Sequence, residues 1–453
     1  MIEFLTDTVA FIVAIALLIA IHEYGHFIVA RKLGIKVEKF SVGFGPSLFS
    51  WRSRDGEVEY ILAAIPLGGY VKMLGENPEE QKEEATTALK AADLARAFHV
   101  QPVWKRAAVA VAGPLFNFLF AIFLYIMIGW SGQQVIPPVV GHINVDSLAE
   151  HAGVQIGDVI TGVNGKPIHA WQHVEEALKP AVGKEVQIDL ARDGRDLQVH
   201  MALPLPKQDA LLSNIGESLV GFSSGQRVFV ASVVKDSPAD RGGLKNGDEM
   251  VRLDHEVVDD VRSLIHYVQQ HAGTAVTMGV LRGDLQMNVQ ITPKADSKTG
   301  LGRMGVVLNA RSIQAPVHYR MGLFEGVSYG FTRTWDMTAM TLEVLGKMVV
   351  NTISPSNLGG PIAIAQMAGQ TVAYGLIPYL LFLALISVNL GVLNLLPVPI
   401  LDGGHLTYLG LEAVRGRPLS PETMEKTQVV GVLLIAALMI FAFYNDIARF
   451  LQG

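Results

Sequence analysis

AAVAVAGPLFNFLFAIFLYIMIG, residues 107–129, is the stretch that decides the fold of this 453-residue chain. It contains no Asp, Glu, Lys or Arg, and a helix of that length, rising about 1.5 Å per residue, crosses a hydrocarbon core of about 30 Å. Three further segments share this character: 9–30, 376–398 and 428–444. The four segments together hold one charged residue, Glu23, although 17% of the whole chain is charged. The sequence therefore predicts a multi-pass α-helical membrane protein, with transmembrane helices at 4–30, 107–129, 376–402 and 428–445.

The distribution of Lys and Arg predicts how the chain is oriented. Basic residues gather in 31–39, at 105–106 and in 415–426, whereas after 107–129 the first one is Lys166. Because loops rich in Lys and Arg stay in the cytoplasm, we expect 31–106 and 399–427 inside the cell and both termini and 130–375 outside. The absence of cysteine excludes disulfides and thiolate metal ligands, and the net charge of −6 argues against a nucleic-acid partner.

The external segment contains an internal repeat with a constant offset of 90 residues. The matching members are Asp146-Ser147-x-Ala149 with Asp236-Ser237-x-Ala239, Gly153 with Gly243, Gly157-Asp158 with Gly247-Asp248, and Arg192 with Arg282. Each copy predicts short strands, a small helix after Asp-Ser, a Gly-Asp turn, a second helix and a β-hairpin. This order resembles PDZ domains, at 130–220 and 221–310. Such modules add a peptide strand to a sheet edge or filter access by size, and the sequence does not choose between these roles.

Three connecting regions have compositions of their own. Residues 36–75 carry Val58, Tyr60 and Leu62 near Pro and Gly turns, which predicts a small membrane-associated β region. Residues 76–106 begin with a run rich in Glu, Lys and Ala and are predicted to be a cytoplasmic linker. Residues 321–370 mix apolar and charged side chains, which favours an amphipathic region at the membrane surface; an ordinary helix packed on the second module is the alternative.

The first apolar segment ends in His22-Glu23-Tyr24-Gly25-His26. On a helix, His22 and His26 lie one turn apart on one face and can share a zinc ion, with Glu23 beside them to deprotonate a bound water. Ionisable groups inside a membrane span are costly, each by about 2.5–3.5 kcal/mol on insertion scales, and are by default functional. The pattern therefore predicts a zinc site rather than a structural polar cluster.

A catalytic zinc ion usually takes three protein ligands, so the pair of histidines needs a third. Asp402 lies in the sequence NLLPVPILDG at the cytoplasmic end of the third segment, and His405 follows closely. We favour Asp402 as the third ligand and keep His405 as the alternative. The prolines and Gly403-Gly404 predict a broken helix there, which is tolerated at membrane depth where the backbone lines a cavity or is buried in protein.

Three asparagines also fall in apolar segments: Asn117, Asn389 and Asn394. Each can donate a hydrogen bond to a substrate carbonyl or its developing oxyanion, and each can equally join two helices. Asn394 is expected in the active site because it stands next to the proposed ligand loop. For Asn117 and Asn389 both roles stay open.

These motifs together resemble the site-2 protease family of M50-type intramembrane zinc metalloproteases. The resemblance rests on HExxH in the first segment, GPxxN in the second, NxxPxPxLDG in the third and a tandem PDZ pair between the second and third, and it covers essentially the whole chain. It implies that His22, His26 and Asp402 bind one Zn²⁺ per chain, that Glu23 is the general base and that Asn394 lies in the catalytic centre.

The resemblance also implies where a substrate binds and what it is. The family's membrane-associated β region corresponds to 36–75, with Gly43-Phe44-Gly45 and Leu67–Val71 as matching stretches, so Gly68, Gly69 and Tyr70 are candidate substrate-binding residues together with Asn117 and Asn389. The implied activity is cleavage of single-span membrane proteins in the bacterial inner membrane, near their cytoplasmic side. An anti-sigma factor already trimmed by another protease and remnant signal peptides are the implied substrates. Because the PDZ pair is expected in the periplasm, on the other side of the membrane from the active site, we expect it to gate substrate entry rather than take part in the chemistry.

A catalytically silent PDZ scaffold that binds the tails of envelope proteins is the rival interpretation. The two differ in one respect, because only the protease needs the Glu23 carboxylate. Replacement of Glu23 with Gln should abolish cleavage of a single-span reporter in the first case and change nothing in the second.

Overall fold

A computed structural model describes residues 2–76, 91–205, 215–254, 256–258, 261–296, 300–350 and 359–452. The chain forms two compact units, which we call the helical unit, Met1–Gln133 with Arg320–Gly453, and the sheet unit, 134–319. Residues 77–90 of the linker predicted at 76–106 lie outside the described residues.

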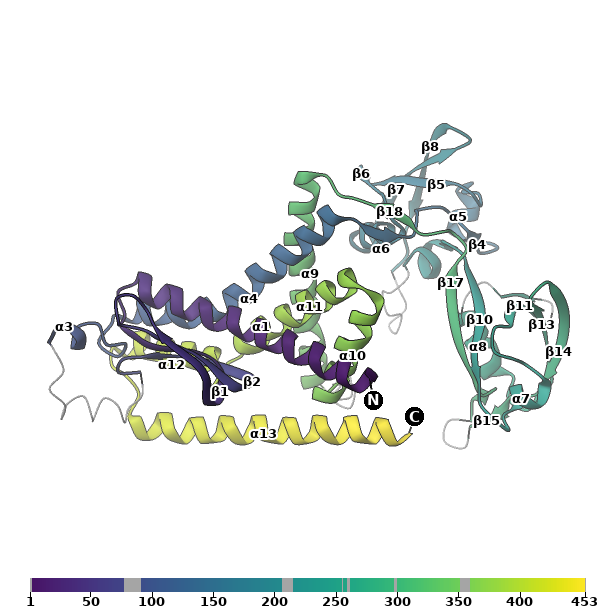
Figure 1. Ribbon diagram of the computed structural model, residues 1–453. Coiled ribbons are helices and arrows are strands. Elements are labelled where there is room, and N and C mark those ends of the chain that lie inside the picture. Colours follow the sequence, from purple (N-terminus) through teal and green to yellow (C-terminus); the bar gives the residue numbers. More distant parts are fainter. Residues whose placement is uncertain are drawn as a thin grey trace. The chain divides into compact units, whose positions relative to one another are not determined.

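The helical unit carries the membrane segments (Figure 1). Its elements are α1 (Ile2–Lys32), β1 (Val37–Arg52), β2 (Glu59–Met73), α3 (Ala91–Leu94), α4 (Val103–Ser131), α9 (Leu323–Val349), α10 (Pro361–Tyr374), α11 (Leu376–Asn394), α12 (Asp402–Arg415) and α13 (Pro421–Gln452). Four of these helices, α1, α4, α11 and α13, are long and apolar enough to cross a membrane. They overlap the four predicted segments, so four apolar helices of sufficient length lie where the sequence predicts them.

The third membrane helix is shorter than the predicted 376–402, because α11 ends at Asn394 and Asp402 begins a new helix, α12. Pro397 and Pro399 explain the interruption, since proline lacks an amide hydrogen and disfavours helical conformation at the residue before it. The predicted broken helix is therefore present.

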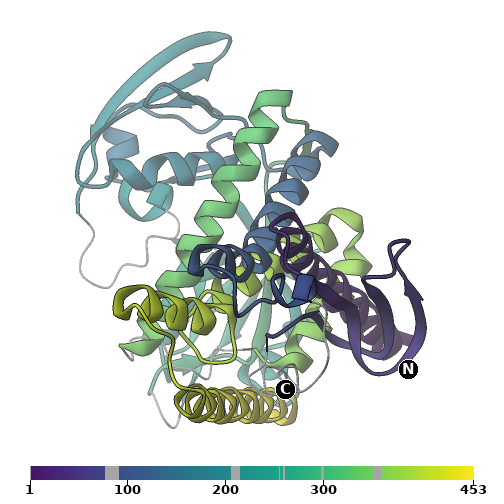
Figure 2. The same cartoon turned by 90° about the vertical axis from the view of Figure 1, so that its left-hand side faces the viewer.

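The helix α4 lies at the centre of the helical unit, where it packs against α1, α9, α11 and α12. Its core with α1 and α11 is built from small and branched apolar residues. At Gly25 of α1 an added Cβ would lie 2.4 Å from the Ala112 carbonyl oxygen of α4, so the absence of a side chain lets these two helices approach closely. In contrast α13 is largely exposed and lies along one side of the helical unit (Figures 1 and 2), where it contacts α10 and, at Gly431, the loop before α12.

The strands β1 and β2 form a small sheet beside α1. Phe40 has two register partners, Val71 and Tyr60, so the first half of β1 lies between the two halves of β2. The second half of β2 is thus an edge of this sheet among the described strands. Further along, Phe49 and Trp51 are exposed, which suits a surface that faces lipid rather than water.

The sheet unit contains the two predicted repeats, each with its own buried core. The first has the sheet β6-β5-β7-β8, with β5 (Val159–Val163), β6 (Lys166–Pro167), β7 (Glu185–Arg192) and β8 (Arg195–Ala202), and the helix α6 (Trp171–Leu178). The second has the sheet β14-β13-β11-β10-β17, with β10 (Gln226–Val233), β11 (Glu249–Leu253), β13 (Val276–Arg282), β14 (Leu285–Ile291) and β17 (Val306–Ser312), and the helix α8 (Val261–Gln270). The first core includes Phe222, two residues beyond the predicted limit of residue 220.

The same ion pair, with a buried aspartate, recurs in both modules at the 90-residue offset. Arg192 donates to both carboxylate oxygens of Asp158, at 2.6 and 2.7 Å, and to the Gly153 carbonyl oxygen at 2.7 Å. Arg282 makes the same three bonds in the second module, to Asp248 and Gly243. Burial alone would raise the pKa of both aspartates, but the guanidinium and a backbone N–H outweigh it and hold each pKa below its ordinary value.

Candidate metal centre

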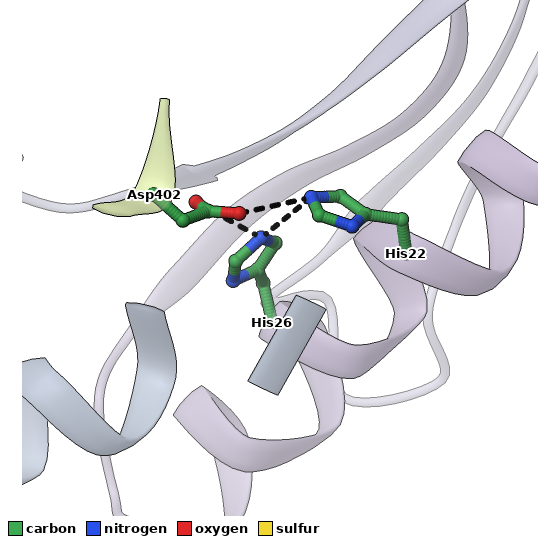
Figure 3. Close-up of side chains that lie close together, drawn as sticks. All are labelled: His22, His26 and Asp402. Atoms are coloured by element: carbon green, nitrogen blue, oxygen red, sulfur yellow. Dashed lines mark hydrogen bonds and ion pairs between the residues drawn. The ribbon is translucent and has the colours of Figure 1, made fainter. Parts of the chain in front are cut away.

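His22, His26 and Asp402 converge although almost the whole chain separates them (Figure 3). The two histidines lie one turn apart on α1, and Asp402 is the first residue of α12. His22 Nε2 is 3.1 Å from Asp402 Oδ2 and 3.2 Å from His26 Nε2, and His26 Nε2 is 3.4 Å from Asp402 Oδ1. Figure 3 shows both imidazole rings pointing at the carboxylate. The predicted set with Asp402 therefore comes together, whereas His405 is not part of this cluster among the described residues.

The separations of these three atoms fit a zinc ion. Ligands at about 2.0–2.1 Å in a tetrahedron stand about 3.3–3.4 Å apart, which is close to the distances between the three donors. Asp402 Oδ2 is buried and, although it lies near His22, accepts no hydrogen bond within the described residues. A buried carboxylate oxygen without a donor needs a compensating charge, and two imidazoles and one carboxylate are a ligand set that zinc accepts.

One face of α4 supports the two histidines from behind. The Val109 carbonyl oxygen accepts from His26 Nδ1 at 2.8 Å, which leaves Nε2 of that ring free to bind a metal. At Gly113 an added Cβ would lie 2.2 Å from His26 Nε2 and 2.8 Å from His22 Cε1. The rings therefore occupy space that any other residue at 113 would fill.

Asn117 completes this support at His22. Its amide lies 3.1 Å from His22 Nδ1, and the amide oxygen, which is fully buried, has no other partner within the described residues. The oxygen and nitrogen of an amide group can be exchanged by a flip with almost no change of shape. The orientation that places Asn117 Oδ1 next to His22 Nδ1 gives this oxygen a hydrogen-bond donor. In that orientation Asn117 fixes the His22 proton on Nδ1 and leaves Nε2 for the metal.

Glu23 faces a cavity of about 540 Å³ that also reaches the metal cluster. Val71 of β2 lines the same cavity. Gly69, in the same strand, lies so close that an added Cβ would be 3.0 Å from Glu23 Cγ. The second half of β2 thus runs directly beside the proposed base.

The other predicted site residues divide into those that line this cavity and those that do not. Asn394, Gly69 and Tyr70 line it, as does His405. Gly68 does not; it has a φ of 149° and makes room for the ring of Phe44. Asn389 lies away from the cavity and accepts a hydrogen bond from Thr341 of α9 at 2.8 Å, which is the interhelical role.

The loop before Asp402 has an unusual backbone. Ile400 has a φ of 88°, a left-handed conformation that is strained for a β-branched residue. At Gly403 and Gly404 an added Cβ would lie 2.1 Å from the Leu396 and 2.4 Å from the Val398 carbonyl oxygen. The two glycines therefore allow the loop to fold back onto the first turn of α12 and bring Asp402 toward α1.

Sequence reasoning missed the supporting role of α4. Gly113 and Asn117 belong to the quoted GPxxN motif, but nothing in the sequence indicates that both contact the histidines. The Val109 carbonyl carries no signal at all, since any residue provides one. The ion pair between Arg106 of α4 and Glu412 of α12, which lines the same cavity, was also missed.

Comparison with known proteins identifies the family of this chain. The family model for peptidase family M50 matches residues 10–438. The chain is 36% identical to the protease RseP of Yersinia pestis, over 99% of this chain and all of that protein. It is also 36% identical to the regulator of sigma-E protease RseP of Escherichia coli, with the same coverage, and 37% identical to a candidate zinc metalloprotease of Ralstonia nicotianae over 97% of this chain and 98% of that protein. Among solved structures, the PDZ domain of the SdrC-like protein from Listeria monocytogenes matches 18% of this chain and 85% of that domain, with 28% identity and a TM-score of 0.17.

The chain therefore belongs to peptidase family M50, the zinc-dependent metalloproteases of the site-2 type. Within that family it closely resembles the regulators of sigma-E protease.

Proposed function

We propose that this protein is an intramembrane endopeptidase that cleaves single-span membrane proteins with one zinc ion held by His22, His26 and Asp402. The observation that carries the proposal is the convergence of these three donors, two from the apolar helix α1 and one from the first residue of α12, at separations of 3.1–3.4 Å. Polar groups at such places are costly in a membrane and are retained for function.

The reaction follows from what surrounds the cluster. A zinc ion bound there supplies a Lewis acid that polarises the scissile carbonyl and acidifies water. Glu23 faces the same cavity, so its carboxylate takes the proton of the attacking water and returns a proton to the nitrogen of the leaving amine. Asn394 lines the cavity as well, and its amide N–H donates to the substrate carbonyl oxygen or to the oxyanion that develops there.

A transmembrane substrate must be unwound before it can be cut, because a helix satisfies its own backbone groups and hides its amides. The second half of β2 offers a sheet edge beside Glu23, at Gly69, Tyr70 and Val71. A substrate strand that pairs with this edge receives replacement hydrogen bonds while its scissile bond lies next to the base. This geometry supports the predicted role of Gly69 and Tyr70, with Gly68 acting indirectly by accommodating Phe44.

Replacement of Glu23 with Gln tests the assignment. It keeps the size of the side chain and all three ligands, so zinc content should stay at one per chain while cleavage of a single-span reporter falls by at least about 1,000-fold. Undiminished cleavage by this variant would overturn the assignment of Glu23 as the base, and absence of cleavage by the original chain would favour the silent scaffold. In parallel, His22→Phe should lose zinc, and an unchanged zinc content would show that the ligands are misassigned.

The substrates are proposed from the relatives. Two close relatives are named as regulators of sigma-E, which supports an anti-sigma factor as a substrate, trimmed beforehand by another protease, together with remnant signal peptides. The Lys and Arg flanks support an inner-membrane location with the active site toward the cytoplasm and the sheet unit in the periplasm. Trapping with the Glu23→Gln protein in cells, followed by identification of the co-purified single-span peptides, tests this choice.

The sheet unit is proposed to gate substrate access through its two PDZ-like modules. All three metal donors come from the helical unit, so the sheet unit adds no ligand among the described residues. A pocket of about 400 Å³ between α8 and β17, lined by Leu264, Val268 and Leu308, suits an apolar side chain of a bound peptide. Deletion of 130–310 should let the enzyme cut an untrimmed substrate. If that substrate stayed intact, the unit would serve recruitment or folding instead.

A further inference from the structure

A largely buried ion pair lines the cavity that reaches the metal cluster. Arg106, near the start of α4, donates to both carboxylate oxygens of Glu412 in α12, at 3.1 and 2.5 Å. The two side chains are only 13% and 16% exposed, and both line the cavity that reaches the metal cluster. Such a bidentate, largely desolvated pair holds two elements in one geometry more firmly than an exposed pair does.

The pair joins the two helices that support and supply the metal ligands. At about 100° per residue, Arg106, Val109, Gly113 and Asn117 lie within an arc of about 80° on α4. The last three of these contact His22 or His26, as described above. The face of α4 that supports the histidines therefore also holds Glu412.

On α12 the ligand and the partner of Arg106 share a face too. Asp402, His405, Leu409 and Glu412 fall within an arc of about 80°, and all four line the cavity. Among the described elements, α4 is the one on which α12 packs extensively. The direction of α12 therefore depends on α4.

The loop that leads into α12 is the other part of the chain that contributes to this direction. Its hydrogen bonds are local, such as Val398 N–H to the Leu396 carbonyl and Leu401 N–H to the Val398 carbonyl, and it includes the strained Ile400. Glu412 stands ten residues after Asp402, about 15 Å along the helix. A tilt of α12 of about 4° would then move Asp402 by about 1 Å, a displacement that costs on the order of 100-fold in rate at an active site.

We infer that Arg106 and Glu412 are positioning residues: their ion pair aligns α12 on α4 and so places Asp402 against His22 and His26 for metal binding. This inference rests on the proposed function, because it takes these three residues as the zinc ligands. Neither Arg106 nor Glu412 contacts the metal donors, so their effect is transmitted through the two helices.

The test uses the purified full-length protein and measures zinc affinity by competition with a chelator, as well as reporter cleavage. Arg106→Gln and Glu412→Gln each remove one charge at nearly constant size and should weaken zinc binding about tenfold, the lower end of the effect of losing a supporting contact at a metal site. The charge-reversed double variant Arg106→Glu with Glu412→Arg restores the pair and should return the affinity to within about threefold of the original.

A matched control and a second readout keep the result unambiguous. Glu343→Gln breaks the exposed ion pair with Lys347 in α9 and should leave zinc affinity unchanged. Substitution with Co²⁺ reports the coordination geometry directly, and the single variants should show an altered visible spectrum that the double variant reverses. These spectra are informative even if the single variants prove less stable.

Two outcomes would overturn the inference. Zinc affinity within threefold of the original in both single variants would show that the pair does not position Asp402. A double variant no better than the single ones would show that any loss has another cause. His22→Phe separates these results from failure of the proposed function, because retention of zinc by that variant would remove the ligand assignment itself.

Discussion

Replacement of Gly113 with Ala should disable the metal site by filling the space that the histidines occupy. The added Cβ would lie 2.2 Å from His26 Nε2, 2.6 Å from His26 Cε1 and 2.8 Å from His22 Cε1. Favourable contacts between carbon and other heavy atoms need about 3.5 Å, so the His26 ring must retreat by more than about 1 Å. A displacement of that size at a reacting centre costs on the order of 100-fold in rate, or about 2.7 kcal/mol.

The loss should appear at the metal and not in the stability of the helix. Gly113 lies in the interior of α4, where Ala is favoured over Gly by up to about 1 kcal/mol. Gly410 of α12 provides the matched control, because nothing lies within 4 Å of a Cβ added there. Gly410→Ala makes the same chemical change on the helix that carries Asp402 and should keep both zinc affinity and activity.

The assay compares three proteins, the original chain and the two variants, for zinc affinity by chelator competition, for reporter cleavage and for thermal unfolding. We expect Gly113→Ala to lose about 100-fold in kcat/KM and to bind zinc more weakly, with an unfolding temperature of the metal-free protein no lower than that of the original. Zinc affinity and cleavage within threefold of the original would refute the close packing of the rings on α4.

Three further predictions address single contacts. Asn117→Leu removes the partner of His22 Nδ1 and should weaken zinc binding about tenfold. Asn117→Asp keeps an acceptor for Nδ1 and should keep most of the zinc affinity. Equal affinities of the two variants in chelator competition would contradict this. Ile400→Gly should raise the unfolding free energy by about 1 kcal/mol, because glycine adopts a φ of 88° without strain. Ile400→Ala keeps most of the strain and should stabilise the protein less. Equal thermal stabilisation by the two variants would contradict this prediction. Asp158→Asn breaks the pair with Arg192 and should destabilise the first module at neutral pH, because it removes the charge-assisted hydrogen bonds to the guanidinium. Because the pKa of Asp158 is lowered on folding, the original chain has this stabilisation above about pH 4 and loses it as the pH falls through the folded-state pKa. Hydrogen exchange of the full-length proteins should therefore show that the stability of the first module depends less on acid pH in the variant. Identical pH profiles for the variant and the original chain would rule this out.

The sequence predicted the membrane helices and the ligands because both leave local signals. A run without charge marks a span whatever it packs against, and HExxH places two imidazoles on one helical face by geometry alone. Asp402 was reached differently, as a carboxylate at a matching depth, so His405 remained an alternative. The structure separates the two because the reversal at Gly403 and Gly404 places Asp402, the first residue of α12, against α1.

The supporting contacts could not be predicted, because they depend on how helices face one another. Asn117 and Asn389 are equivalent in sequence terms, as single amides in apolar segments. One contacts His22 and the other bonds to Thr341, and only the rotation of α4 and α11 decides which. The 90-residue repeat differs from these asparagines, because it leaves a signal in the sequence. Arg192 and Arg282 recur together with Asp158 and Asp248, and this recurrence indicates a contact between each arginine and its aspartate.

The arrangement around α4 shows why a site of this kind needs a rigid helix behind it. In water, loosely held histidines and a carboxylate would exchange their unsatisfied polar atoms with solvent, but at membrane depth each such atom needs a fixed partner. Here α4 supplies these partners from one face: a carbonyl for His26 at Val109, an amide for His22 at Asn117, and open space for both rings at Gly113. The buried Asp402 Oδ2 lies next to the Nε2 atoms of the two histidines and still lacks a hydrogen-bond donor among the described residues. The fold thus gives Nδ1 of each histidine a hydrogen-bond partner, which leaves both Nε2 atoms and the Asp402 carboxylate available to bind a cation.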